Sequence, residues 1–403
     1  MQTRLLDSVR QTSAGKIAES ILRKCVHCGF CNATCPTYQL SGDENEGPRG
    51  RIYLIKQLLE GQSAGKNTLQ HLDRCLLCRN CETTCPSGVE YGKLLDIGRH
   101  IAEQQIGRDS KDKSLRKRLR KYLPKPGLFG FGLSVGRTLK PLLPDRIAGK
   151  VTEQRPAGNW PAPRHDRKML VLDGCVQPSL SPDINAATAR VLDKLGISLI
   201  KAQGAGCCGA VSQHLGAPDE AITFIKRNID AWWPYLTTSG AEAIITTASG
   251  CGAMIKDYKH YLRDDPEYFI KAERISHLNR DIAEIISKEK YQQLAPAKGA
   301  RVAWHPPCSL QHGLKLGGVV ENILLDCGFV LVPVEEEHTC CGSAGTYSIL
   351  QPDIAQQLRT NKLANLTRHA PECIVTANIG CQTHLQENSP IPVKHWIHLL
   401  DQA

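Results

Sequence analysis

Two cysteine motifs near the N-terminus constrain this chain more than any other feature. The first, CVHCGFCNATCP, runs from Cys25 to Pro36, and the second, CLLCRNCETTCP, runs from Cys75 to Pro86, so both have the spacing C-x2-C-x2-C-x3-C-P. Eighteen cysteines in 403 residues would indicate a disulfide framework only in a small secreted domain. The N-terminal stretch lacks the continuous apolar segment of a signal peptide. We therefore expect a cytoplasmic, reducing location, in which the thiols bind metal or do redox chemistry.

The spacing of these cysteines predicts iron-sulfur clusters rather than zinc. Zinc ribbons use two C-x2-C pairs, which explains neither the third in-phase cysteine nor the repeated Cys-Pro. C-x2-C-x2-C-x3-C-P is the spacing of bacterial two-cluster ferredoxins, in which the fourth cysteine binds the other cluster. We therefore predict two [4Fe-4S] clusters. Their expected ligands are Cys25, Cys28, Cys31 and Cys85 for cluster 1, and Cys75, Cys78, Cys81 and Cys35 for cluster 2.

Composition and patterning divide the chain into four segments. Residues 1–104 hold both motifs and, between them, the helix-like stretch Arg49–Leu59, which predicts a helical two-cluster ferredoxin domain. Residues 105–167 form a basic, proline-containing linker with one short helix. Residues 168–290 and 299–403 are two copies of one cysteine-rich repeat. Next to the helix-like stretch, Pro48, Arg49 and Arg51 suit a helix start, and contact with a partner protein is the alternative.

Each copy of the repeat reads strand, Cys, helix, strand, Cys-Cys-Gly, helix, strand, Gly-Cys. Strands that alternate with helices predict parallel sheets covered by helices, so the expected fold class is α + α/β: a helical ferredoxin domain, then a duplicated α/β domain. Ligands of such sheets gather beyond the carboxyl ends of the strands. The repeated cysteines are therefore expected to hold a further cluster or to act as redox thiols, and buried structural thiols are the alternative. They are Cys175, Cys207, Cys208 and Cys251 in the first copy, and Cys308, Cys340, Cys341 and Cys381 in the second.

Several other residues are assigned ordinary roles. Cys327 and Cys373 have no counterpart cysteine in the first copy and are expected in the core. The sequence Gly204–Gly209 matches G-x-G-x-x-G, but the second copy lacks this pattern, so no dinucleotide site is expected. Four histidines lie near the second set of cysteines, where surface or hydrogen-bonded roles are preferred to metal ligation or proton transfer. They are His305, His312, His338 and His384.

The net charge of +10 is local. Between Arg108 and Lys168 there are 17 Lys and Arg against 5 Asp and Glu. This basic segment suits a solvated linker, a docking strip for another subunit, or an anionic membrane face touched by apolar side chains. Nucleic acid is not expected as a partner, because aromatic residues are few and no recognition motif accompanies the charge. No transmembrane helix is expected either, since no stretch of about 18 apolar residues occurs. The apolar side chains of the segment are Leu123, Leu128, Phe129, Phe131 and Leu133.

Taken together, the motifs resemble a known family. Two C-x2-C-x2-C-x3-C-P motifs followed by paired Cys-Cys-Gly domains resemble the iron-sulfur subunits of glycolate oxidase, anaerobic glycerol-3-phosphate dehydrogenase and lactate utilisation systems, and subunits of heterodisulfide reductase. The segments GPRGRIYLIKQLLEG, HLDRCLLCRNCETTCPSGV and IVTANIGCQTHL are most similar to glycolate oxidase iron-sulfur subunits. The resemblance covers nearly the whole chain and is weakest in the basic linker.

This resemblance implies an electron-transfer subunit of a glycolate dehydrogenase complex. Flavin-binding partner subunits would oxidise glycolate to glyoxylate, so this chain would carry no catalytic residue of that reaction. It would pass electrons toward quinone, in a cytoplasmic complex that is peripheral on the inner membrane. The alternatives are a related lactate or glycerol-3-phosphate dehydrogenase subunit, a heterodisulfide-reductase-like catalytic subunit, and a structural zinc protein. Heterodisulfide reductase relatives use five cysteines per domain, and here Met254 and His384 occupy the fifth positions.

Overall fold

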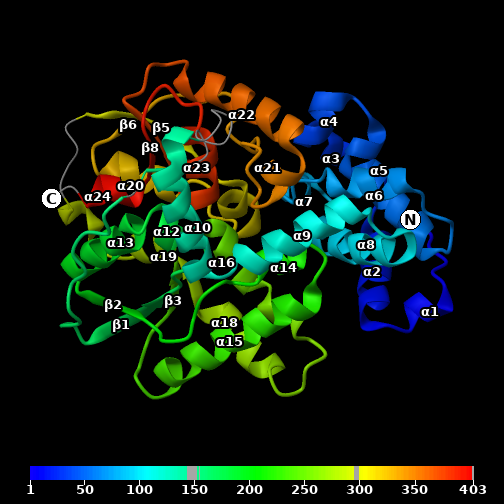
Figure 1. Ribbon diagram of the computed structural model, residues 1–403, viewed down its shortest axis with the longest axis horizontal. Helices are drawn as coiled ribbons and strands as arrows, with labels where there is room; N and C mark the ends of the chain where they lie inside the picture. The colour runs from blue at the N-terminus through cyan, green and yellow to red at the C-terminus, as the bar shows by residue number, and fades with distance from the viewer. Residues whose placement is uncertain (143–151, 154, 295–298, 402–403) are drawn as a thin grey trace. The chain divides into compact units, whose positions relative to one another are not determined.

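The computed structural model of the protein describes residues 1–142, 152–153, 155–294 and 299–401 (Figure 1). The chain divides into two compact units. Unit 1 comprises residues 1–117 and 338–362, and unit 2 comprises residues 118–337 and 363–403.

Unit 1 is helical. The predicted helix is confirmed as α5, Pro48–Leu59, and Pro48 lies in its first turn, where the missing N–H is not needed. Helix α5 packs closely against α8 (Tyr91–Ile106), because Gly98 carries no side chain: a Cβ there would lie 2.6 Å from Cγ1 of Ile55. The other elements are α1 (Asp7–Arg10), α2 (Ser13–Lys24), α3 (Phe30–Ala33), α4 (Pro36–Ser41), η1 (Glu44–Glu46), α6 (Lys66–Asp73), α7 (Asn80–Thr84) and α21 (Tyr347–Leu350).

Unit 2 holds two four-stranded parallel sheets, which confirms the fold class predicted for the repeat. The strand orders are β2-β1-β3-β4 and β6-β5-β7-β8, so the two copies have the same topology. The predicted strands are β1 (Arg167–Val171), β2 (Ile197–Lys201), β3 (Ile244–Thr246), β5 (Arg301–His305), β6 (Val330–Leu331) and β7 (Cys373–Thr376). The sequence did not predict the last strand of either sheet, β4 (Asn279–Asp281) or β8 (Val393–His395). Both are three residues long and mostly polar, so they lack a strand pattern.

Helices cover both faces of the first sheet. Met169 and Val171 of β1 belong to one core cluster with α13 (Asp183–Lys194) and α19 (Ile282–Ile286). Leu170 and Leu172 belong to the other, with α15 (Pro218–Thr237) and α18 (Phe269–Leu278). This alternation is what a strand buried on both faces requires. The remaining elements of unit 2 are η2 (Lys140–Leu142), α12 (Gln177–Leu180), α14 (Ala210–His214), α16 (Ser249–Lys256), α17 (Tyr258–Tyr261), η3 (Tyr291–Gln293), η4 (Ser309–Gly313), α20 (Val319–Asp326), α23 (Ile379–Gln386) and α24 (Ile397–Leu400), and α22 (Pro352–Thr367) runs across both units.

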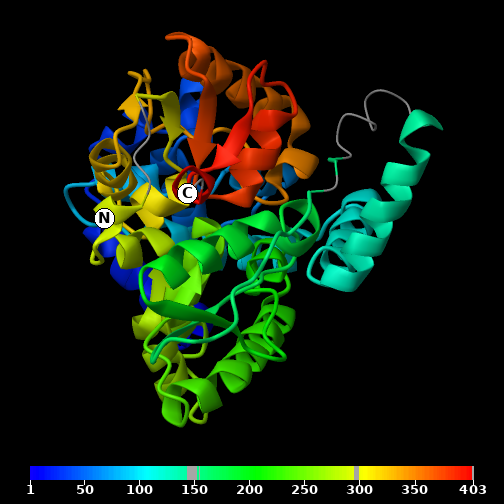
Figure 2. The same cartoon turned by 90° about the vertical axis from the view of Figure 1, so that its left-hand side faces the viewer.

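The two copies of the repeat share one core. Side chains of both sheets belong to the same hydrophobic cluster, and α13 of the first copy contacts α24 of the second. Figures 1 and 2 show these two helices between the sheets. Cys327 and Cys373, 2% and 7% exposed, lie in this cluster, so the prediction that they are core residues is confirmed.

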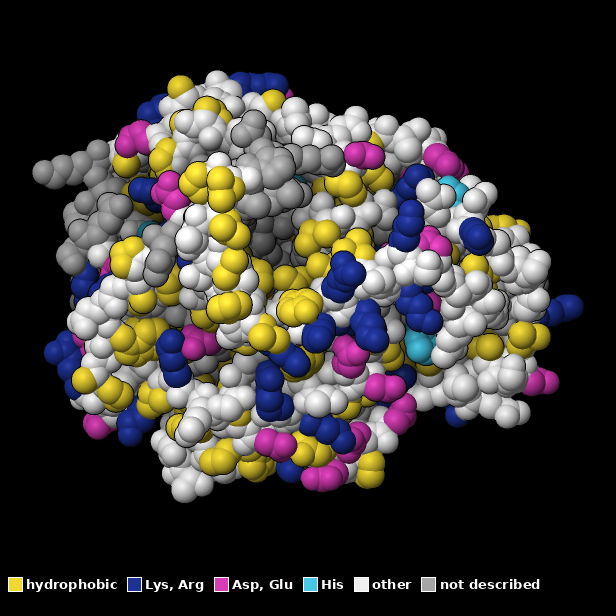
Figure 3. All heavy atoms as spheres, viewed as in Figure 1, with side chains coloured by type: hydrophobic (Ala, Val, Ile, Leu, Met, Phe, Trp, Pro, Cys, Tyr) yellow, Lys and Arg dark blue, Asp and Glu magenta, His cyan; other side chains and the backbone are white. Residues whose placement is uncertain are grey.

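In the part of the basic segment that the structure describes, two α-helices occur where the sequence predicted one short helix. Helix α9 spans Ser110–Tyr122 and α10 spans Pro126–Leu139. Several glycines interrupt α10, each costing about 1 kcal/mol relative to alanine in a helix, so local propensity disfavours it. No residue of α10 is buried, and Figure 3 shows hydrophobic side chains running along it.

His395 at the end of β8 joins the two copies. Its side chain is fully buried, Nδ1 accepts the N–H of Ile397 at 3.2 Å, and Nε2 lies 2.9 Å from the carbonyl oxygen of Thr247 in the first copy. With Nδ1 accepting, the proton belongs on Nε2, which donates to Thr247. Burial, followed by the neighbouring His398, lowers the pKa of His395 to about 3. The ring is therefore neutral in the folded protein.

We expect His395 to make the fold acid-sensitive. In the unfolded chain its pKa is about 6.5, so only the unfolded state takes up a proton below that pH. The stabilisation is present above the unfolded pKa and is lost as the pH falls toward the folded pKa. Between pH 7.5 and 5.5 the loss is about 1.4 kcal/mol. Denaturation midpoints of His395→Gln should lack this part of the pH dependence, whereas exposed His277→Gln should keep it. Equal pH profiles for His395→Gln and wild type would contradict this role.

Candidate metal centres

The two cysteine motifs fold into the same loop. The second and fourth residues after the first cysteine have positive φ: His27 (58°) and Gly29 (86°) in one loop, Leu77 (55°) and Arg79 (60°) in the other. Three of these four are not glycine, and each pays about 1 to 2 kcal/mol for the left-handed conformation. The short helices α3 and α7 follow and carry the third cysteine of each motif. Strain repeated at matched positions indicates a loop shaped by its function.

The two loops pack against each other through α3 and α7. Thr34 and Thr84 precede the last cysteine of each motif, and their hydroxyl oxygens lie 3.2 Å apart. The same 50 residues separate these threonines and the two motifs, so the contact pairs equivalent residues. Asn80 Nδ2 also donates to the carbonyl oxygen of Thr34 at 3.2 Å. This packing draws the end of each motif toward the other motif.

One group of thiols surrounds Cys31. Burial raises the pKa of Cys31 to about 11, and the nearby Cys25, Cys85 and Cys28 act in the same direction. A cavity beside them is lined by these four cysteines and also by Cys81. Three thiols of the first motif and the last thiol of the second motif thus line the same cavity. That donor set fits a cubane cluster, whose iron atoms bind thiolate sulfur.

A second group surrounds Cys81. Burial raises the pKa of this thiol, and Cys78, Cys75, Glu82 and Cys35 act in the same direction. The backbone N–H of Leu77 also donates to Sγ of Cys75, at 3.4 Å. The second group therefore mirrors the first, with three thiols from its own motif and one from the other. None of the eighteen cysteines is in a disulfide.

A buried ion network lies beside the second group. Arg51 is 0% exposed; its Nη2 donates to Oε2 of Glu46 at 2.7 Å, and its Nη1 donates to Thr37 at 3.0 Å. Burial opposes the charge of Arg51, but nearby Cys75, Tyr91, Cys35 and Glu46 hold its pKa above the ordinary value. Glu46 also accepts from Arg74 at 2.8 Å. Arg51 is thus an internal positive charge among the thiols, and the alternative that it contacts a partner protein is wrong.

The Cys-Cys-Gly segment of the second copy belongs to unit 1. The hydroxyl of Tyr347 donates to the carbonyl oxygen of Arg74 at 2.9 Å, and Asn80 Nδ2 lies 3.4 Å from the carbonyl oxygen of His338. Burial raises the pKa of Tyr347, and Cys75 and Cys340 both contribute in the same direction. Cys340 therefore lies in the same surroundings as the second motif.

In unit 2, the structure brings the four repeated cysteines of the first copy together. Cys175 and Cys251 follow β1 and β3, on either side of the point where the strand order reverses, which is where open α/β sheets bind ligands. Cys207 is hydrogen-bonded to Cys175 and Cys208, and Cys208 to Cys251. The bonds from its neighbours lower the pKa of Cys207, and the same contacts raise those of Cys175 and Cys208.

The loop that carries Cys207 and Cys208 is held from behind by Asn228 and Tyr258. Asn228 Nδ2 donates to the carbonyl oxygen of Cys207 at 2.9 Å, and its Oδ1 accepts the N–H of Gly206 at 2.9 Å. The hydroxyl of Tyr258 donates to the carbonyl oxygen of Cys208 at 2.9 Å. Both side chains are fully buried. The sequence offered no signal for either residue, because nothing local relates them to the cysteines.

Within unit 2, the second copy has a different arrangement. Cys308 follows β5 and Cys381 lies on α23. A ring nitrogen of His305, from β5, lies within 4.8 Å of Sγ of Cys381. His305, His312 and His384 are all largely buried, so a surface role is wrong for these three.

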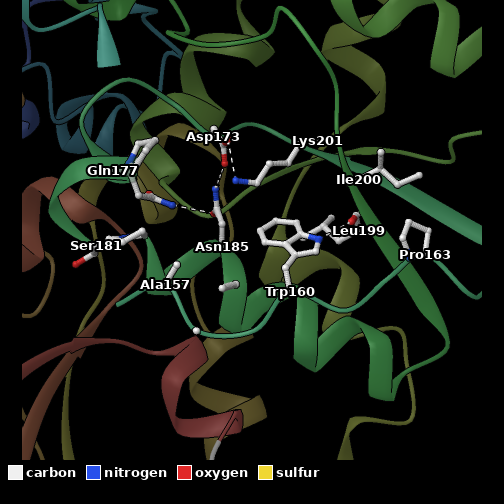
Figure 4. Close-up of a pocket in the computed structure, with 14 residues that line it drawn as sticks. Ala157, Trp160, Pro163, Asp173, Gln177, Ser181, Asn185, Leu199, Ile200 and Lys201 are labelled. Carbon is white, nitrogen blue, oxygen red and sulfur yellow. Dashed lines mark hydrogen bonds and ion pairs between the residues drawn. The ribbon is translucent and has the colours of Figure 1, made fainter. Parts of the chain in front are cut away.

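A cavity of about 480 Å³ opens at the carboxyl ends of β1 and β2 (Figure 4). Trp160 forms one wall, and the ammonium of Lys201 lies 4.7 Å from its ring centre. Lys201 also pairs with Asp173 at 3.0 Å. Asp173 and Gln177 line the cavity and flank Cys175 in sequence, so a small molecule held here would lie against the loop of that thiol.

Comparison with known proteins identifies the family. A model of the 4Fe-4S dicluster domain matches residues 21–89, and a model of a cysteine-rich domain matches residues 169–256 and 302–386. The chain is 53% identical to the glycolate oxidase iron-sulfur subunit of Escherichia coli (strain K12), across 100% of this chain and 99% of that protein. The chain belongs to the family of glycolate oxidase iron-sulfur subunits.

Two more distant relatives match most or part of this chain. The probable glycolate oxidase iron-sulfur subunit of Bacillus subtilis (strain 168) is 30% identical over 91% of this chain and 88% of its own length. Lactate utilization protein A of Bacillus licheniformis is 24% identical and matches 58% of this chain. As a member of the family, the protein carries two [4Fe-4S] clusters. The zinc alternative is therefore wrong.

Two arginines on α5 provide a matched test of the network beside the second group of thiols. Replacing buried Arg51 by Met leaves the carboxylate of Glu46 with too few partners, which we expect to cost about 3 to 5 kcal/mol. Arg49 pairs with Glu44, but both side chains are more than a third exposed, so Arg49→Met should cost about 1 kcal/mol or less. Denaturant midpoints of the two variants give the comparison, and equal losses would contradict the role assigned to Arg51.

Proposed function

We propose that this protein relays electrons from a flavin-binding partner subunit, which oxidises glycolate to glyoxylate, toward a quinone. The observation that carries the proposal is the pair of thiol groups in unit 1, one of which reaches the surface at Cys28. Glycolate loses two electrons and two protons, and a quinone gains the same number as it becomes quinol. A [4Fe-4S] cluster accepts and gives one electron at a time. Two such centres in one unit therefore suit passage between two-electron partners.

The ligand sets that we propose are the crossed ones. Cluster 1 takes its thiolates from the group around Cys31, and cluster 2 takes them from the group around Cys81. The neighbours that raise the pKa of Cys31 include Cys85, and those that raise the pKa of Cys81 include Cys35. Each group therefore contains the last cysteine of the other motif, which supports the crossed ligand sets. The proposed ligands are Cys25, Cys28, Cys31 and Cys85 for cluster 1, and Cys75, Cys78, Cys81 and Cys35 for cluster 2.

The surroundings of the two groups favour entry of electrons at the first. Cys28 is exposed, and so are its apolar neighbours Val26 and Phe30, at 68% and 61%. An exposed apolar patch around a redox thiol suits docking of a protein partner. Cys81, in contrast, is buried, and its group lies in the same surroundings as Cys340. We propose that electrons leave unit 1 on that side.

This chain also sets the conditions under which electrons move. Arg51 keeps a positive charge beside Cys75 and Cys35, which favours the reduced, more negative state of a cluster bound there. The buried positions of Cys25, Cys35 and Cys81 keep water away from the sulfur ligands. Charge and solvent exposure are among the factors that set the potential of such centres.

We further propose that Cys175, Cys207, Cys208 and Cys251 hold an additional iron-sulfur cluster. Their chain of thiol contacts at the sheet edge supports this set. The buried Met254 occupies the fifth position, so these four thiols are the proposed ligands. A heterodisulfide-reductase-like activity is the second candidate, because the same contacts place Cys207 and Cys208 where a disulfide could be exchanged.

For location we propose the cytoplasmic side of the inner membrane, in association with the flavin subunits.

Replacing one ligand of each cluster tests the relay. Cys28→Ser and Cys78→Ser should each disturb one cluster, weaken the cubane EPR signal of the reduced protein, and abolish dye reduction that depends on glycolate and the flavin partner. Cys327→Ala provides the control, because Cys327 lies in the core of unit 2, so iron content and electron transfer should stay unchanged. Retained electron transfer in both serine variants would exclude the relay, and retained iron would exclude the ligand assignment.

The additional cluster predicts more iron than two cubanes supply. Two [4Fe-4S] clusters account for about eight iron atoms per chain, and we expect a higher content that falls back to about eight in Cys251→Ser. Met254→Leu, on the same helix, should leave the iron content unchanged. If wild type holds only about eight and the four cysteines react with a thiol reagent, the cluster is excluded and the thiol-exchange candidate is favoured.

A further inference from the structure

Helix α10 exposes a row of large apolar side chains. Leu128, Phe131, Val135 and Leu139 are 45%, 71%, 41% and 43% exposed. They are spaced three, four and four residues apart, which places them on one face of a helix. Leu142, just beyond α10, extends the row at 81% exposure. Figure 2 shows α10 near the right-hand edge, with open space on its outer side.

The opposite face of α10 is fixed to unit 2. Arg137 donates from Nε to the carbonyl oxygen of Thr152 at 2.8 Å, and from Nη2 to that of Ser179 at 3.1 Å. Gly130 allows a close approach, because a Cβ there would lie 2.9 Å from Oγ of Ser179. At about 100° per residue, Arg137 and Gly130 lie on the side away from Phe131. The apolar row is therefore held outward by contacts behind it.

Positive charge surrounds the apolar row. From Ser114 to Leu142 the chain has eight Lys and Arg and no Asp or Glu. Arg118 and Lys121, on the last turns of α9, and Lys125, just before α10, are exposed. Lys140 follows α10 at its other end. Apolar side chains with cations at both ends match the boundary between the acyl chains and the anionic headgroups of a bilayer.

We infer that α10 is a lipid-binding helix, which lies on the surface of a bilayer that contains anionic lipid. Leu128, Phe131, Val135 and Leu139 enter the headgroup region, while Arg118, Lys121 and Lys125 bind lipid phosphates. The inference deepens the proposed function, on whose membrane location it rests, because it names a contact made by this chain itself rather than by its partner subunits.

Lipid fits this surface better than a protein partner does. The row is one side chain wide, whereas a stable protein interface needs about 800 Å² on each side with polar pairs around it. Every charged residue of the stretch Ser114–Leu142 is Lys or Arg, which favours an extended anionic surface over one of mixed charge. Among the described residues, no helix combines the length and hydropathy that a membrane span requires. A helix that lies on the bilayer is the arrangement that remains for these side chains.

Vesicle sedimentation of the iron-loaded full-length chain tests the inference. Wild type should sediment with vesicles of equal parts phosphatidylglycerol and phosphatidylcholine, and not with pure phosphatidylcholine. Phe131→Ser should weaken binding about tenfold, because one aromatic side chain no longer enters the bilayer. The double variant Lys121→Gln/Lys125→Gln should weaken it by about tenfold or more, since each cation near an anionic surface contributes.

Matched variants elsewhere in unit 2 serve as controls. Ile270 on α18 is 63% exposed, so Ile270→Ser removes a similarly exposed apolar side chain away from the row. Lys288 and Lys290 are both exposed, so Lys288→Gln/Lys290→Gln removes the same charge. Both controls should bind vesicles as wild type does.

Three results would overturn the inference. The first is wild-type binding that is equal with and without phosphatidylglycerol. The second is unchanged vesicle binding by Phe131→Ser. The third is a Phe131→Ser variant that loses binding to the flavin partner, or loses self-association, but still binds vesicles. Failure of the proposed electron relay can be distinguished from failure of lipid binding. Phe131→Ser should accept electrons in solution as wild type does, and Cys78→Ser should bind vesicles while losing electron transfer.

Discussion

The rest of this structure depends on the crowding of thiols into two small groups within unit 1. An iron ligand must be a thiolate, yet burial raises the pKa of Cys31 to about 11, and the neighbouring cysteines act in the same direction. Without metal these thiols keep their protons, because ionising several of them together would bury like charges. Iron replaces those protons and supplies the compensating positive charge, so cluster binding and folding of this unit are coupled. The left-handed residues of both loops and the threonine pair between them hold this arrangement.

The same requirement explains why the charged side chains around the thiols are buried. Arg51 has no exposed surface, and its charge is balanced by the carboxylate of Glu46. A buried ion pair alone is weak evidence for stability, since desolvation can exceed the gain. Beside a centre that changes charge during its work, however, a fixed cation has a further effect on the potential. Arg49, two residues earlier, is partly exposed with Glu44, so about half a turn of α5 separates a buried cation from a surface one.

Local patterns predicted those parts of the protein whose cause is local. The spacing of eight cysteines, the helix at Arg49–Leu59 and three strands of each sheet follow from residues that are close in sequence. Strands β4 and β8 escaped prediction because three mostly polar residues carry no period, and only the neighbouring strands make them strands. Helix α10 escaped because its glycines oppose a helix, and contacts of Arg137 with distant carbonyl groups decide the outcome. Asn228 and Tyr258, which hold the Cys-Cys-Gly loop, are 21 and 50 residues from the cysteines that they support.

The two copies of the repeat have the same strand order but have diverged around the cysteines. Helix α15 begins at Pro218, and Asn228 lies ten residues later. The side-chain amide of Asn228 donates to the backbone of Cys207. Ten residues after Pro352, at the start of α22, stands Lys362. A lysine has no acceptor and cannot repeat both bonds of that amide. The loop of Cys340 is instead part of unit 1, where Tyr347 donates to the backbone of Arg74. One duplicated motif thus keeps its four thiols at the edge of its own sheet, while the other supplies Cys340 to the surroundings of the second ferredoxin motif.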